Sequence, residues 1–91
     1  MAQALQVIAE LFGQTLANLG NVQAEAGRPE QARSYYLEAL DFLRPLPDKR
    51  ALGVLLSSIA LQDAAVGRHE EAIANFTQAL DCHRAVGDED C

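Results

Sequence analysis

The sequence has few of the residues on which disulfide-bonded, metal-binding and catalytic proteins depend. Its 91 residues include two cysteines, two histidines and no tryptophan. His69 and His83 are fourteen residues apart on one predicted helix, about 21 Å along its axis, so they cannot serve one metal ion or one proton transfer. Cys82 is expected to be a small buried residue that forms no disulfide with Cys91. We therefore predict no enzyme activity, no cofactor and no metal site.

Basic residues and long apolar runs are also scarce. Seven basic residues against 13 acidic ones give a net charge of −6, which argues against the phosphate-neutralising surface that nucleic-acid binding requires. No apolar run approaches the ~20 residues that span a bilayer. The N-terminus lacks the basic start and the small-residue cleavage site of a signal peptide. We expect no nucleic-acid partner, no membrane association and a cytoplasmic location.

The three prolines lie in or beside predicted turns, and 49% of the residues are hydrophobic with no β-branched runs, which predicts an all-α protein. Gly27 can end one helix in the left-handed conformation, Pro29 fits the first turn of the next, and Asp48 is a predicted N-cap. Apolar residues at steps of three and four indicate helices near 2–26, 29–44, 49–66 and 69–86.

The chain repeats itself after forty residues. Residues 13–51 laid over 53–91 without gaps give 12 identical pairs among 39: Gly13/Gly53, Leu16/Leu56, Ala24/Ala64, Gly27/Gly67, Arg28/Arg68, Glu30/Glu70, Ala32/Ala72, Ala39/Ala79, Leu40/Leu80, Asp41/Asp81, Arg44/Arg84 and Asp48/Asp88. Most are turn, close-contact or core positions, so the copies share a packing scheme. We predict one domain over 1–91, with repeat 1 near 13–52, a helical extension at 2–12, and repeat 2 near 53–91.

Each copy carries a recognisable motif: Leu16, Leu19, Gly20, Gly27, Ala32, Tyr36, Ala39 and Leu40 in the first, and Leu56, Ile59, Ala60, Gly67, Ala72, Phe76, Ala79 and Leu80 in the second. This pattern resembles the tetratricopeptide repeat (TPR). Gln23 and Asp63 stand where the family has an aromatic residue. The forty-residue period is similar to the long-helix subclass of LGN/Pins-like scaffolds and kinesin light chains. The resemblance implies two stacked antiparallel hairpins, as in a right-handed α-solenoid fragment.

In such repeats the first helices of successive hairpins line a concave groove that binds a peptide or a partner helix. The resemblance places ten residues there: Gln14, Ala17, Asn18, Asn21, Glu25, Val54, Ser57, Ser58, Leu61 and Ala65. It also implies that Asn18 and Asn21 hold the backbone of an extended peptide, a task that suits an amide because it both donates and accepts. The alternative is that both asparagines are polar residues on a solvated face. The net charge favours a basic or neutral segment.

The second candidate surface is the pair of helix flanks at the two ends of the stack. Repeat arrays usually need about three units and a polar cap, and this chain has two units without one. Six apolar residues are expected on the uncovered flanks: Leu5, Ile8, Phe12, Ile73, Phe76 and Leu80. The sequence thus predicts a non-catalytic protein-interaction module, and a self-assembling unit, a homodimer or larger, as the alternative.

Overall fold

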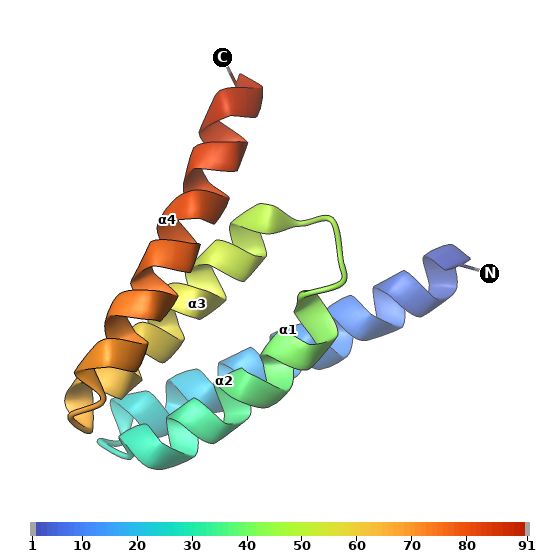
Figure 1. The fold of residues 1–91 in the computed structure, drawn as a ribbon. Coiled ribbons are helices and arrows are strands. Elements are labelled where there is room, and N and C mark those ends of the chain that lie inside the picture. Colours follow the sequence, from blue (N-terminus) through green and yellow to red (C-terminus); the bar gives the residue numbers. More distant parts are fainter. Residues whose placement is uncertain (1, 91) are drawn as a thin grey trace.

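The computed structural model describes residues 2–90 of the chain, with the side chains of residues 4–84. These residues form four helices joined by short connections: α1 (Ala2–Glu25), α2 (Pro29–Leu43), α3 (Lys49–Ala65) and α4 (His69–Asp90) (Figure 1). Residues 2–90 contain no strand, so the predicted all-α class is confirmed.

The turns within the hairpins form where the sequence indicated them. Gly27 and Gly67 adopt φ values of +76° and +84°, a conformation that costs glycine little because it has no Cβ. The Arg28 backbone N–H then donates to the Gln23 carbonyl oxygen at 2.9 Å, which satisfies an otherwise unpaired carbonyl at the helix end. Figure 1 shows both hairpin turns at one end of the molecule and the link from α2 to α3 at the other.

The starts of α2 and α3 also match the prediction. Pro29 is the first residue of α2, where its missing N–H would have had no partner in the helix. Asp48 is the N-cap of α3, and its Oδ1 accepts from the Ala51 backbone N–H at 3.1 Å. Local signals alone therefore position the two hairpins along the chain.

The helices pack in chain order, α1 on α2, α2 on α3 and α3 on α4. The core follows from this order, because α2 and α3 are covered on two sides and supply most of the fully buried residues: Ala32, Tyr36, Ala39, Leu43, Leu52, Leu55, Leu56, Ile59 and Ala60. Gly20 allows α1 to approach α2 closely, since a Cβ there would lie 2.6 Å from the Tyr36 ring. The helices α1 and α4 form the two ends of the stack.

One expectation about the helices requires correction. The prediction ended the last helix near residue 86, but α4 continues to Asp90; Gly87 weakens a helix by only about 1 kcal/mol, and no proline follows it as Pro45 follows α2. Tyr36 and its counterpart in the second repeat, Phe76, differ in burial. Tyr36 is 3% exposed and Phe76 is 41% exposed, because α4 packs on α3 alone whereas α2 lies between two helices.

Candidate functional site: the groove between the hairpins

A cavity of about 310 Å³ opens between α1, α2 and α3. We call it the groove. Its lining residues come from all three helices: Gln14, Ala17, Asn18 and Asn21 from α1, Tyr36 and Leu43 from α2, and Ala51, Val54, Leu55 and Ser58 from α3. None of the ten carries a charge, so a bound segment would meet small apolar side chains and a few neutral polar groups.

Six of the ten residues predicted for a groove line this cavity: Gln14, Ala17, Asn18, Asn21, Val54 and Ser58. The other four, Glu25, Ser57, Leu61 and Ala65, lie outside its lining. Leu61 and Ala65 follow Ser58 at steps of three and four residues, which keeps them on the same face of α3 towards its C-terminal end. Both are exposed, so this face continues beyond the cavity.

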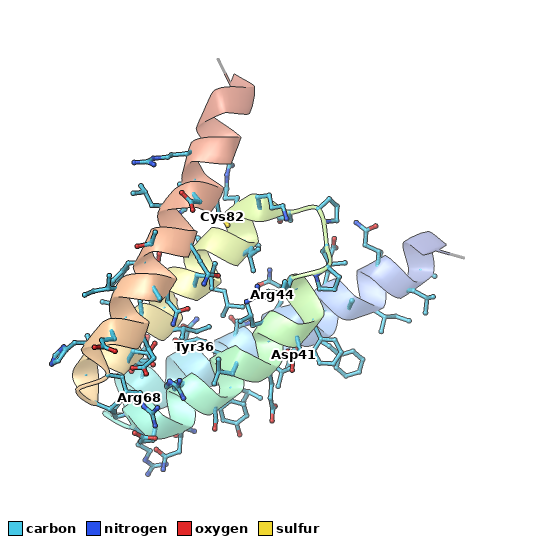
Figure 2. All side chains as sticks on the ribbon, in the orientation of Figure 1. Tyr36, Asp41, Arg44, Arg68 and Cys82 are labelled. Atoms are coloured by element: carbon cyan, nitrogen blue, oxygen red, sulfur yellow. The ribbon has the colours of Figure 1, made fainter. Side chains whose placement is uncertain are left out.

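Tyr36 joins the two walls of the groove, a role that the sequence did not reveal. Its hydroxyl donates to Asn21 Oδ1 at 2.5 Å, and its ring fills the space beside Gly20. Because Oδ1 accepts from Tyr36, the Asn21 Nδ2 group keeps its two N–H donors for a carbonyl oxygen in the groove. Figure 2 labels Tyr36 inside the angle formed by the two hairpins.

Burial raises the pKa of the Tyr36 hydroxyl above its ordinary value of 10.0. A hydrogen bond with Ser58 acts in the opposite direction, and the negative charge of Glu25 raises the pKa further. The first cause is desolvation of the phenolate form, which the protein interior disfavours. Tyr36 therefore stays a neutral hydrogen-bond donor at physiological pH, and Glu25 supplies a negative charge close to the groove.

A buried ionic cluster connects the two hairpins. Asp63 on α3 is 0% exposed, and its Oδ1 forms an ion pair with Nε of Arg33 on α2. Its Oδ2 accepts from Nδ2 of Asn75 on α4 at 2.8 Å. One carboxylate thus bonds to side chains of both neighbouring helices. One sign of this cluster was visible in the sequence: Asp63, a charged residue, stands where the tetratricopeptide pattern has an aromatic residue.

The outer flanks carry most of the exposed large apolar side chains. On α1, Leu5, Ile8, Leu11 and Phe12 are between 49% and 70% exposed, and on α4 so are Ile73 at 66% and Leu80 at 49%. Ile8, Leu11, Phe12 and Thr15 surround an apolar cavity of about 300 Å³. Phe12 stacks on Phe42 of α2 with ring centroids 5.6 Å apart. All six residues predicted for the flanks are exposed.

The described residues offer little for catalysis or metal binding. His69 and His83 are both exposed, and no group of three or more His, Cys, Asp or Glu side chains within the described residues could hold a metal ion.

Cys82 is a free thiol, half-buried rather than buried, against Leu52, Leu56 and Ala79 (Figure 2). The expectation for Cys91 lies outside the described residues. Within the described part, every helix is too short or too polar to cross a bilayer.

Two helical hairpins that stack in series and share a groove define a helical-repeat protein. Residues 13–42, which contain the second half of α1 and almost all of α2, match the family model of the tetratricopeptide repeat. This match covers a third of the chain and supports a tetratricopeptide repeat at residues 13–42. Comparison with curated proteins and with solved structures gives no significant match. Tetratricopeptide repeats generally serve as protein–protein interaction modules and are typically non-catalytic.

Proposed function

We propose that this chain is a non-catalytic interaction module whose groove holds an extended segment of a partner protein. The observation that carries the proposal is that Asn18, Asn21 and Ser58 surround one cavity, whose other lining residues are Gln14, Tyr36 and five small or apolar side chains. Extended peptides are recognised largely through their backbone, which needs donors and acceptors beside narrow apolar walls. Asn21 fits this role especially well because Tyr36 orients its amide.

Charge selects among the segments that could enter. The groove lining is uncharged, but Glu25 lies near Tyr36 and the chain has a net charge of −6. A basic or neutral segment is therefore favoured over an acidic one, and its association slows as salt screens the attraction. Two repeats offer a short contact, so the affinity is expected to be micromolar or weaker.

The test is a library of short peptides displayed on an array, sorted by net charge and probed with the parent chain. Asn18→Ala combined with Asn21→Ala should weaken binding of the best peptide about tenfold or more, because two neutral hydrogen bonds at about 1 kcal/mol each are lost. The matched control is Gln31→Ala with Gln78→Ala, two exposed amides on α2 and α4 outside the groove lining.

Circular dichroism should show the same helicity and melting temperature for the parent and both double variants. Undiminished binding by the Asn18→Ala, Asn21→Ala variant would refute the groove as the binding surface. A consistent preference for acidic peptides would contradict the electrostatic part of the proposal and leave the groove itself standing.

A second candidate function is self-association through the outer flanks. It is favoured by one observation, the exposure of Leu5, Ile8 and Phe12 on α1 together with Ile73, Phe76 and Leu80 on α4. Clusters of exposed large apolar side chains, here on both outer helices of the stack, are typical of interaction surfaces. The alternative does not compete with the groove, because the flanks and the groove are different faces of the helices.

A further inference from the structure

We propose that copies of this chain stack head to tail, with α4 of one copy covering α1 of the next as α2 covers α3 within the chain. The inference rests on the second candidate function, self-association, and specifies its geometry. Its starting point is the forty-residue repeat, which makes α4 the counterpart of α2 and α1 the counterpart of α3. The contact between α2 and α3 therefore serves as a template for a contact between copies.

The surface to be covered is on α3 within the chain and on α1 between copies. On α3, Leu55 and Ile59 lie in one core cluster with residues of α2 and are 3% and 0% exposed. Their counterparts on α1, forty residues earlier, are Thr15 and Leu19. Both are exposed, Leu19 at 40%. Leu19 thus repeats the apolar character of Ile59 without a helix of a second hairpin to cover it.

The covering surface is on α2 within the chain and on α4 between copies. Tyr36 and Leu40 on α2 belong to or pack against the core cluster that includes Leu55 and Ile59 of α3. Their counterparts on α4 are Phe76 and Leu80, which are 41% and 49% exposed. An aromatic residue and a leucine therefore stand in the same places on the uncovered face of α4.

The contact between copies would also differ in charge. Inside the chain, Arg33 of α2 pairs with buried Asp63 of α3. The counterparts of these two residues are Ile73 and Gln23, so a contact between copies would bury no charge at these two positions. Gln23 Oε1 is already buried without a hydrogen-bond partner among the described residues, and covering it therefore adds little desolvation. The Arg33–Asp63 ion pair also disfavours a contact in which α4 of another copy replaces α2 against α3. Such a contact would leave buried Asp63 without a cation.

A contact of this kind joins two different surfaces, and each copy keeps one of each. Stacking would therefore continue from copy to copy instead of closing as a two-fold dimer. Because every copy is negatively charged and the contact is apolar, added salt should strengthen stacking by screening the repulsion. Peptide binding in the groove has the opposite salt dependence, which separates the two activities.

The experiment blocks one flank at a time. Leu19→Asp alters the α1 flank and Ile73→Asp alters the α4 flank; both residues are exposed, so each variant should keep the helicity of the parent. By analytical ultracentrifugation the parent should form a concentration-dependent series of assemblies, and each variant alone should be monomeric. The equimolar mixture should form a heterodimer and nothing larger, since one intact α4 flank then meets one intact α1 flank.

Leu61→Asp is the matched control, because Leu61 is 59% exposed on α3, lies off both flanks and changes the charge equally. It should assemble as the parent does. A mixture of the two flank variants that stays monomeric, an Ile73→Asp variant that still dimerises, or a parent that is monomeric at every concentration would each overturn head-to-tail stacking. None of these results would affect groove binding, which the Asn18→Ala, Asn21→Ala variant tests separately.

Discussion

The buried carboxylate of Asp63 makes the stability of the stack depend on one cation, Arg33. Replacing Arg33 with methionine keeps most of the aliphatic stem and removes the guanidinium group. Asp63 is 0% exposed and retains only the Asn75 hydrogen bond at 2.8 Å, so its charge cannot reach water. Breaking a buried ion pair from one side costs about 3 to 5 kcal/mol. Because Asn75 still donates, and because the Arg33 side chain is 21% exposed in the parent, we expect about 3 kcal/mol.

This loss is large for so small a domain. At about 0.05 to 0.15 kcal/mol per residue, 91 residues give a free energy of unfolding of about 5 to 14 kcal/mol. With a urea dependence of about 1 to 1.5 kcal/mol per molar, the Arg33→Met variant should unfold about 2 to 3 M earlier than the parent. Urea titration followed by circular dichroism measures this shift directly.

Two further variants test the physical reason. Asp63→Asn should cost less than Arg33→Met, because it leaves a guanidinium group that is partly exposed and can contact water. The double variant should lose less than the sum of the two single losses, since it leaves no unpaired charge. Arg50→Met is the control: Arg50 is exposed on α3, and its replacement should change the free energy of unfolding by no more than about 0.5 kcal/mol. An Arg33→Met variant as stable as this control would refute the reasoning.

Two other predictions concern Tyr36. Gly20→Ala places a Cβ 2.6 Å from the buried Tyr36 ring. Because this overpacking outweighs the gain in helix propensity, the variant should lose about 1 to 2 kcal/mol of unfolding free energy in a urea titration. Gly53→Ala, whose new Cβ would have its nearest contact at 3.2 Å, should lose less. Because folding raises the pKa of Tyr36 above 10.0, its neutral form stabilises the fold below that pH, and the contribution is lost as the pH rises through the folded-state pKa. The free energy of unfolding of the Tyr36→Phe variant, measured above pH 10, should therefore fall less steeply with rising pH than that of the parent. Equal slopes for the two proteins would contradict this.

The sequence by itself determined the helices, the hairpins and the repeat. Gly27, Pro29 and Asp48 act within a few residues of their own positions, through a left-handed φ, a fixed φ and a side-chain cap, so their effect can be read locally. The forty-residue repeat predicted two hairpins of the same kind. The family resemblance implied a groove, and six of the ten residues it placed there, Gln14, Ala17, Asn18, Asn21, Val54 and Ser58, line one cavity in the fold.

Only the tertiary structure decided which side chains meet across the helices. Arg33 and Asp63 are thirty residues apart, and Tyr36 and Asn21 are fifteen apart; helical periodicity gives the face of each residue but not the distance or crossing angle between helices. The helix–helix distances also decide burial, since Tyr36 and Phe76 hold equivalent positions yet are 3% and 41% exposed. The same motif becomes core on α2 and surface on α4 because α2, unlike α4, has a helix on both sides.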